Sequence, residues 1–250
     1  MKILFATSEV YPFLKTGGLA DVSASLPVAL HKLGVDIRLV LPAYGELLAK
    51  HARWQVAALW QDPQEPEPTR VLQGTLPGSD VLVYLIDTHR HFSRRGNPYL
   101  GYDGRDWPDN AARFAHFNRA ATALALDQVG LDWRADLVHC NDWQTGLIPV
   151  LLKLTPPPVP PTLCTIHNLA YQGVFSHAAF THLSLPAHLW SLHGVEFYGQ
   201  FSFLKAGLQF ADWLTTVSPT YAQEIQQAEL GYGLDGLLRA RQHQLSGILN

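Results

Sequence analysis

Short runs of apolar residues alternate along the chain with stretches in which apolar positions recur every three to four residues. A short apolar run between turn residues is typical of a buried strand, and the helical spacing that follows it predicts a helix packed on the sheet. The predicted strands are residues 3–6, 35–41, 71–72, 81–86, 135–140, 163–166, 214–217 and 245–249. The predicted helices are residues 22–33, 110–124, 147–154, 201–211 and 221–228.

This alternation predicts an α/β fold whose doubly wound parallel sheet is covered by helices on both faces. The strands between residues 71 and 86 suggest an antiparallel excursion, and residues 62–68 have the composition of a solvated loop. Residues 90–109 form a loop long enough to suggest a function, and Asp109 suits the cap of the next helix. The proline run at 156–161 is an internal loop by this interpretation, because the alternation resumes directly after it.

Composition narrows the class of protein. Of 250 residues, 47% are hydrophobic and 16% charged, with a formal net charge of -3, which favours a packed core over a disordered chain. No run of Lys or Arg indicates nucleic-acid binding, and no apolar stretch approaches the roughly 18 residues of a membrane span. Cys140 and Cys164 lie in apolar segments, so we expect two buried, reduced thiols in a cytoplasmic protein.

Polar residues follow the carboxyl ends of several predicted strands. In open parallel sheets ligands bind at this edge, so these side chains are expected to converge on one cleft. They are Thr7, Ser8, Glu9, His139, Asn141, Asp142, His167, Asn168 and Ser218. Asp142 and Ser218 also suit the caps of the following helices, and His167 equally suits a half-buried structural histidine.

The segment at residues 15–18, with the sequence KTGG, opens the first predicted helix. Paired glycines let a ligand approach the backbone closely, and free N–H groups at a helix start beside a lysine suit a phosphate. The segment matches neither the P-loop pattern nor the dinucleotide-binding pattern, and an ordinary glycine turn is the alternative. No zinc-binding or nucleophile-elbow motif occurs, and His89 and His91 form a lone pair in a loop.

Motifs spread over the whole chain resemble one enzyme family, the bacterial glycogen synthases and plant starch synthases. The most specific is KTGGLADV at residues 15–22, and the others follow it in the family's order. They are NPY at 97–99, VHCNDW at 138–143, TIHNLAYQG at 165–173, HGVEF at 193–197, SFLKAG at 202–207, TVSPTYA at 216–222 and GYGLDGLL at 231–238. Gln144 departs from the histidine that family members often carry after the Asp-Trp pair.

The resemblance implies a Rossmann-like fold that forms the N-terminal half of a GT-B glycosyltransferase. Residues 1–245 would then be the N-terminal domain on the glucan-acceptor side and residues 246–250 the start of the interdomain hinge, with the C-terminal donor domain absent from the chain. The implied reaction transfers glucose from ADP-glucose to the non-reducing 4-hydroxyl of an α-1,4-glucan such as glycogen. The anomeric configuration is retained, and neither a metal nor an organic cofactor takes part.

The resemblance also assigns roles to individual residues. His167 is expected to be catalytic, beside the transferring glucose. The expected donor-binding residues are Lys15, Gly17, Gly18 and Asn250. The expected acceptor- and sugar-binding residues are Glu9, Asp21, Tyr99, Asp142 and Asn168.

An alternative from a different class is a truncated, non-catalytic homologue that binds glucan. A transferase of a neighbouring GT-B family is disfavoured by KTGGLADV, and an oxidoreductase by the missing dinucleotide motif. As one half of an active site, the chain by itself is expected to bind glucan weakly and to transfer little glucose. The sequence leaves the oligomeric state open.

Overall fold

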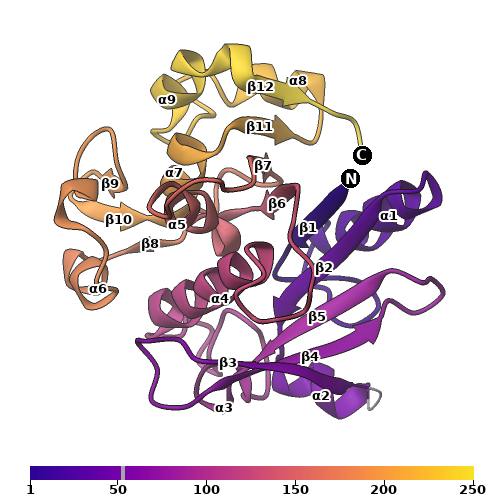
Figure 1. Cartoon of the computed structure of the whole chain (residues 1–250). Helices are drawn as coiled ribbons and strands as arrows, with labels where there is room; N and C mark the ends of the chain where they lie inside the picture. The colour runs from indigo at the N-terminus through magenta and orange to yellow at the C-terminus, as the bar shows by residue number, and fades with distance from the viewer. Residues whose placement is uncertain (52–53) are drawn as a thin grey trace. The chain divides into compact units, whose positions relative to one another are not determined.

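The computed structural model describes residues 1–51 and 54–250. The chain forms two compact units, Met1–Asp136 and Leu137–Asn250. In Figure 1 the first unit runs from indigo to magenta and the second from pink to yellow. No helix in the described residues is long and apolar enough to cross a membrane.

The first unit consists of a five-stranded sheet with helices on both faces. Its elements are β1 (Lys2–Ala6), α1 (Leu19–Lys32), β2 (Asp36–Pro42), α2 (Gly45–Lys50), β3 (Gln55–Trp60), β4 (Thr69–Thr75), β5 (Leu82–Asp87), α3 (His89–Phe92) and α4 (Asn110–Ala125). The strand order is β1-β2-β5-β4-β3. Strands β1, β2 and β5 are parallel, whereas β4 pairs antiparallel with β5 and β3 with β4, which confirms the predicted antiparallel excursion.

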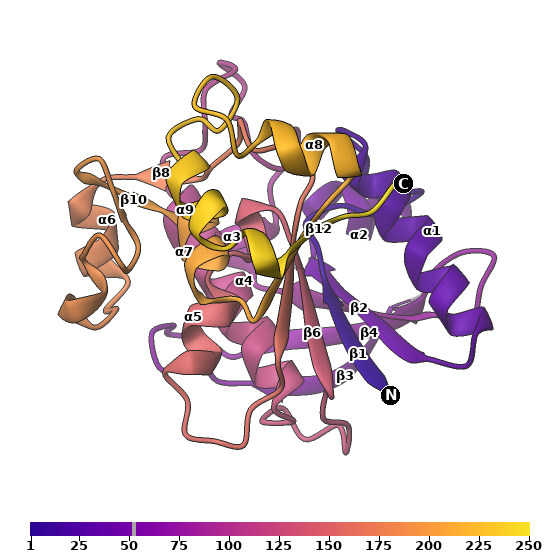
Figure 2. The same ribbon diagram turned by 90° about the horizontal axis from the view of Figure 1, so that it is seen from above.

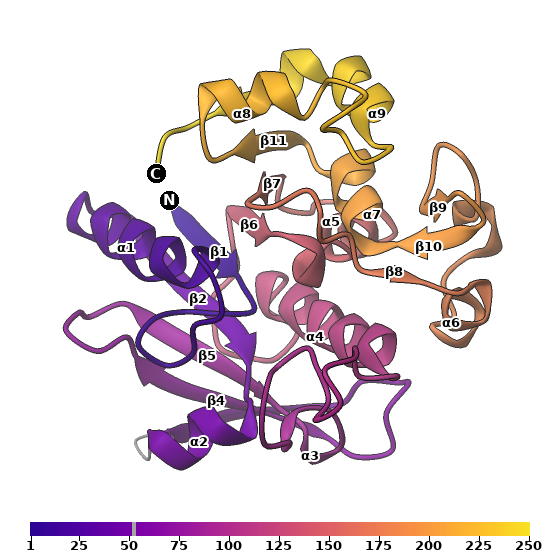
Figure 3. The same cartoon turned by 180° about the vertical axis from the view of Figure 1, so that it is seen from behind.

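Burial in this sheet follows from its two covered faces. Strand β1 is buried from Ile3 to its end because α1 and α4 flank the sheet on opposite sides, as Figures 2 and 3 show. Helix α4 is buried along almost its whole length, and its buried residues include Arg113 and His116. Asp109 stands at the cap position of α4, but its side chain makes no capping bond and pairs with Arg94 instead.

The second unit contains a four-stranded parallel sheet and a small three-stranded sheet. Its elements are β6 (Leu137–Asn141), η1 (Trp143–Thr145), α5 (Ile148–Lys153), β7 (Thr162–Ile166), β8 (Val174–Phe175), α6 (His177–His182), η2 (Ala187–Leu189), β9 (Glu196–Phe197), β10 (Gln200–Ser202), α7 (Phe203–Phe210), β11 (Trp213–Thr216), α8 (Pro219–Glu224), α9 (Asp235–Ala240), η3 (Gln242–Gln244) and β12 (Leu245–Gly247). The parallel strands lie in the order β6-β7-β11-β12.

The small sheet has the order β8-β10-β9 and is antiparallel throughout. With α6 it occupies the left side of Figure 1. Its strands are two or three residues long, too short to show a period of two in the sequence, and they were not predicted. Strand β3 and helix α9 were not predicted either, and the helix predicted at 221–228 extends beyond the end of α8 at Glu224.

The predicted doubly wound α/β fold is confirmed for the main elements of both units. Residues 156–161 join α5 to β7 inside the second unit, as expected of an internal loop. Cys140 and Cys164 are buried and free, as predicted. The division between the units falls after Asp136, at a position that no shift in composition marks.

Candidate functional site

In the first unit the carboxylate of Glu9 is the centre of a buried polar network. Glu9 follows β1 and is 3% exposed. It accepts hydrogen bonds from the Thr16 hydroxyl at 2.5 Å, the Thr16 amide, the Gly17 amide at 3.3 Å and the Tyr99 hydroxyl at 2.7 Å. Four donors compensate the burial of this charge and tie the segment at residues 15–18 to the loop that carries Tyr99.

The Tyr99 hydroxyl connects Glu9 to a second residue after β1. It lies 2.8 Å from the Ser8 hydroxyl while it donates to Glu9. Burial is the main cause that raises the pKa of Tyr99 well above its usual value, and the Glu9 carboxylate adds to it. Tyr99 therefore stays protonated and keeps its donor at neutral pH.

Lys15 and Asp21 form an exposed ion pair at the start of α1. The Lys15 ammonium lies 2.8 and 2.7 Å from the two carboxylate oxygens of Asp21. Both side chains are about half exposed, so the pair stabilises the fold little. It holds the lysine next to the first turn of α1.

Gly17 and Gly18 need not be glycine to satisfy the fold. A methyl group built on either one meets no atom within 4 Å, and neither has a positive φ. Gly18 has φ -67° and ψ -22° at the start of α1, where no side-chain hydrogen bond caps the helix within the described chain. No side chain at these two glycines therefore blocks a group that approaches the start of α1, although the Thr16 and Gly17 amides already donate to Glu9.

In the second unit Asp142 holds the peptide that follows β7. Its Oδ1 accepts hydrogen bonds from the His167 amide at 2.7 Å and the Asn168 amide at 3.4 Å. Asp142 has φ +56° and ψ -172°, a conformation that costs a non-glycine residue about 1–3 kcal/mol. The capping alternative for Asp142 is wrong, since its side chain makes no capping bond. It is confirmed for Ser218, which accepts from the Tyr221 amide at 2.9 Å.

His167 is neutral at physiological pH. Burial lowers the pKa of its imidazole to about 4. Its Nε2 lies 3.0 Å from the carbonyl oxygen of the Asn141 side chain, which can only accept, so Nε2 carries the proton and Nδ1 keeps its lone pair. The parallel register places Asn141 opposite Thr165, near the end of β7. Asn141 was predicted at the strand ends, but not as the partner of His167.

Two neighbouring residues complete the local structure around His167. Asn168 is exposed, and its Oδ1 accepts from the Ala170 amide at 3.0 Å, which closes a tight turn. His139 is buried 2.6 Å from the Thr165 hydroxyl, and burial lowers its pKa to about 3, in agreement with a structural histidine. Asn250 is exposed, three residues after the end of β12.

The predicted site residues thus form separate groups. In the first unit Glu9, Gly17 and Tyr99 share one network, and Lys15 pairs with Asp21 beside Gly18. In the second unit Asp142, His167 and Asn168 share another. Thr16 was missed, because nothing in its local pattern shows that it would donate twice to a carboxylate seven residues earlier.

One group of potential metal ligands occurs in the described residues, although none was predicted. Glu65, His91 and His116 place ligand atoms within 4.8 Å of one another. His116 also lies 2.9 Å from Asp62, whose carboxylate accepts from Arg119 at 2.6 Å. The guanidinium already neutralises a carboxylate, so we interpret the group as a buried ion-pair network that holds the segment at 62–65 on α4. The solvated loop predicted at 62–68 is exposed over most of its length, but Asp62 is an exception at 0% exposed.

Comparison with known proteins defines the class to which this fold and these residues belong. The sequence profile of the starch synthase catalytic domain matches residues 2–240. The chain belongs to this family, and the resemblance stated above is confirmed.

Particular relatives agree. The chain is 60% identical over 248 residues to the glycogen synthase of Cellvibrio japonicus (strain Ueda107), covering 99% of the chain and 51% of the relative. It is 55% identical over 251 residues to the glycogen synthase of Thioalkalivibrio sulfidiphilus (strain HL-EbGR7), with 100% and 52% coverage. The chain therefore spans about half the length of these relatives.

A solved structure shows the same fold. It is the catalytic domain of Starch Synthase IV from Arabidopsis thaliana bound to ADP and acarbose, with a TM-score of 0.84 and 29% sequence identity. The match covers 100% of the present chain and 51% of that chain. The fold is therefore that of one half of a GT-B glycosyltransferase.

Proposed function

We propose that the chain provides the acceptor-side half of a glycogen synthase active site. The reaction is transfer of glucose from ADP-glucose to the non-reducing 4-hydroxyl of an α-1,4-glucan, with retention of the anomeric configuration. Its relatives are named glycogen synthases, and the starch synthase neighbour was solved with ADP and acarbose, a nucleotide and an oligosaccharide analogue.

The observation that carries the proposal is the open glycine pair, Gly17 and Gly18. Because neither packing nor a positive φ requires glycine at these positions, a ligand that approaches the backbone closely is the remaining physical reason for them. The amides at the start of α1 and the Lys15 ammonium suit a diphosphate, since the positive end of the helix dipole favours an anion. We propose that this turn stabilises the charge that grows on the leaving ADP.

Glu9 and Tyr99 have a supporting role in this proposal. The Gly17 amide already donates to Glu9, and the Asp21 and Val22 amides donate to the Gly18 carbonyl. The diphosphate would therefore use the amides of Gly18 and Leu19, and Glu9 would hold the turn in place for them. Asp21 would hold Lys15 through their ion pair until ADP-glucose arrives. We assign Asn250 to the nucleotide pocket on the resemblance alone.

His167 is proposed to bind the transferring glucose. A neutral imidazole hydrogen-bonds to sugar hydroxyls without repelling the positive charge that develops at the anomeric carbon. The Asp142 carboxylate accepts from the His167 and Asn168 amides. Because the Asn168 amide and the His167 carbonyl belong to the same peptide unit, Asp142 also limits the direction in which the His167 carbonyl points. Asn168, exposed beside it, is proposed to line the acceptor path.

The proposed reaction uses no metal or organic cofactor, because Lys15 and backbone amides compensate the charge of the leaving diphosphate. Two buried thiols fit a reducing compartment, and we propose the cytoplasm.

The test is glucosyl transfer by the complete gene product, with labelled ADP-glucose or UDP-glucose and glycogen as acceptor. We expect incorporation from ADP-glucose, a drop of about a hundredfold or more in turnover for His167→Ala, and a raised KM for ADP-glucose in Lys15→Ala. Preference for UDP-glucose would contradict the donor assignment. Turnover of His167→Ala close to that of the unaltered protein would contradict the role of His167.

A further inference from the structure

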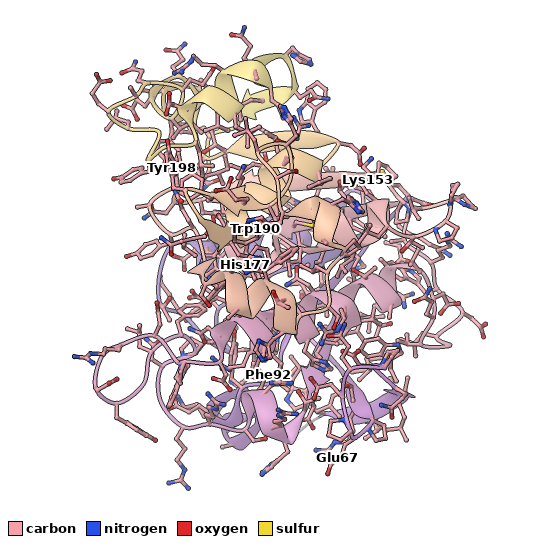
Figure 4. The ribbon with its side chains drawn as sticks, turned by 90° about the vertical axis from the view of Figure 1, so that its left-hand side faces the viewer. Glu67, Phe92, Lys153, His177, Trp190 and Tyr198 are labelled. Atoms are coloured by element: carbon pink, nitrogen blue, oxygen red, sulfur yellow. The ribbon has the colours of Figure 1, made fainter. Side chains whose placement is uncertain are left out.

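Three tyrosine side chains stand out from the surface of the second unit. The exposed fractions are 67% for Tyr171, 78% for Tyr198 and 55% for Tyr232. Figure 4 shows Tyr198 projecting away from the ribbon, whereas Trp190 and His177 lie packed against each other beneath it. Large aromatic side chains gathered at a surface mark an interaction site more often than chance exposure does. We call Tyr171, Tyr198 and Tyr232 the tyrosine platform.

Contacts between three segments bring the platform together. A methyl group built on Gly233 would lie 3.0 Å from Cε2 of Tyr198, so the Tyr198 ring packs directly against the residue after Tyr232. The side-chain amide of Gln172, the residue after Tyr171, donates to the Tyr232 carbonyl at 3.0 Å. The turn after β7, the β9–β10 turn and the turn before α9 therefore meet at these residues.

Two of the three tyrosines stand at unusual backbone positions. Tyr198 and Tyr232 have φ values of +48° and +50°, and each is followed by a glycine at positive φ. A tyrosine in this region costs about 1–3 kcal/mol relative to an ordinary conformation. The turn at Tyr198 is secured by the Gly199 amide, which donates to Glu196 at 2.6 Å. These turns set the backbone from which the two rings project.

The chemistry of the platform points to a neutral, hydroxyl-rich ligand. Each ring offers an apolar face that suits the C–H face of a pyranose and a phenol group that suits its hydroxyls. The acidic residues Glu196 and Glu229 stand close in sequence to Tyr198 and Tyr232 and disfavour nucleic acid or another polyanion. Carboxylates also accept hydrogen bonds from sugar hydroxyls.

The platform continues from the His167 segment in the same unit. The Tyr171 amide donates to the Asn168 carbonyl at 3.2 Å, within the turn that directly follows His167. We infer that Tyr171, Tyr198 and Tyr232 bind an α-1,4-glucan chain outside the reacting position. This inference rests on the proposed function for the identity of the polymer.

Native electrophoresis of this chain in gels that contain glycogen tests the platform. Tyr198→Asn and Tyr232→Asn remove the rings while asparagine tolerates positive φ, so folding should be preserved. Tyr102→Asn, which removes a tyrosine 84% exposed on the first unit, is the matched control. We expect glycogen to retard the unaltered chain, and each platform variant to bind it about fivefold to tenfold more weakly. The control should retain its affinity, and maltoheptaose should reverse the retardation.

The outcomes separate the platform from the proposed function. Equal retardation of the unaltered chain and both variants would overturn the inference that the tyrosine platform binds glucan, and it would leave the proposed transfer reaction intact. No retardation of the unaltered chain would also overturn it, whereas the transfer assay with ADP-glucose decides the proposed function independently. Variants that change only self-association in sedimentation velocity would show a protein interface instead. If the circular dichroism of one variant shows misfolding, Tyr171→Ala replaces it.

Discussion

The carboxylate of Asp142 accepts a hydrogen bond of 2.7 Å from the backbone amide of His167, which lies 25 residues further along the chain. Asp142 reaches this position from a backbone conformation that is unfavourable for any residue except glycine. The bond joins the end of β6 to the end of β7, and it keeps the His167 peptide in one orientation. Asp142 is therefore a positioning residue for His167 in addition to any direct contact with sugar.

Replacing Asp142 should affect both stability and activity. Asp142→Ala leaves the His167 amide without its acceptor and keeps an unfavourable φ, so we expect the free energy of unfolding in urea to fall by about 1–3 kcal/mol. We expect turnover of the complete gene product to fall about a hundredfold, because the His167 peptide is displaced. Asp142→Asn retains an acceptor oxygen on a side chain of the same shape and adds no backbone cost beyond that which Asp142 already bears, so its free energy of unfolding should stay close to that of the unaltered protein. If turnover falls as far in Asp142→Asn as in Asp142→Ala, the negative charge of Asp142 is itself needed for activity.

The glycines of the chain should separate into those that serve a ligand and those that serve packing. Gly17→Ala meets no atom of the protein, so its stability should change by less than about 0.5 kcal/mol while its KM for ADP-glucose rises. Gly146→Ala is the control, because its methyl group would lie 2.0 Å from the Phe203 carbonyl oxygen. We expect it to lose about 3 kcal/mol or more of stability. An unchanged KM in Gly17→Ala would remove the reason for a ligand at this turn.

Two buried histidines should make the second unit sensitive to mild acid. The pKa is lowered by burial to about 4 for His167 and, mainly by burial, to about 3 for His139. Between these values and the ordinary 6.5 the unfolded chain binds more protons than the folded one, so stability falls as pH falls from about 6.5. At pH 5 each histidine should lower the free energy of unfolding by about 2 kcal/mol, and urea titrations between pH 7 and about pH 5 will measure this decrease. In His139→Gln the free energy of unfolding should depend less steeply on pH. If it depends on pH as steeply as in the unaltered protein, His139 is not a source of the acid sensitivity.

The Asp62 network should respond to pH in a lower range. Burial opposes ionisation of Asp62, but hydrogen bonds from His116, the Gln64 amide and Arg119 outweigh it and lower its pKa from 3.8 to about 2. The network therefore contributes its full stability above pH 3.8, and the contribution is lost as pH falls toward 2.

Asp62→Asn tests this contribution in the first unit. It removes the nearer carboxylate from Arg119 and His116 and leaves them with Glu65 at 4.0 and 3.9 Å, and we expect a loss of about 3 kcal/mol at pH 7. The gap between the variant and the unaltered protein should narrow as the solution approaches pH 3. A constant gap would show that the carboxylate charge is not the source of the stability.

The main elements of the fold could be predicted because their information is local. The run at Ile3–Ala6 and the helical spacing after Gly18 identify β1 and α1 without reference to the rest of the chain. The polar residues after β1, β6 and β7 were found in the same way, because the end of a buried strand is visible in the sequence. Elements of two or three residues, such as β8 and β9, carry no such period.

The partners of these residues could not be predicted. Tyr99 donates to Glu9 across 90 positions, and Asp62 meets His116 across 54. His89 and His91 were read as a lone pair, whereas the fold buries His91 against His116 with ring centroids 5.0 Å apart. Only packing of distant segments creates such neighbours.

The sequence by itself determined where strands and helices form, which residues stand at the strand ends and to which family the chain belongs, because hydrophobic period and motif order are properties of the linear chain. Tertiary structure alone decided which partner each polar side chain has, which histidines stay neutral and which tyrosines share a surface. The physical reason is that hydrogen bonding and burial depend on neighbours in space, and folding brings together residues that are far apart in sequence.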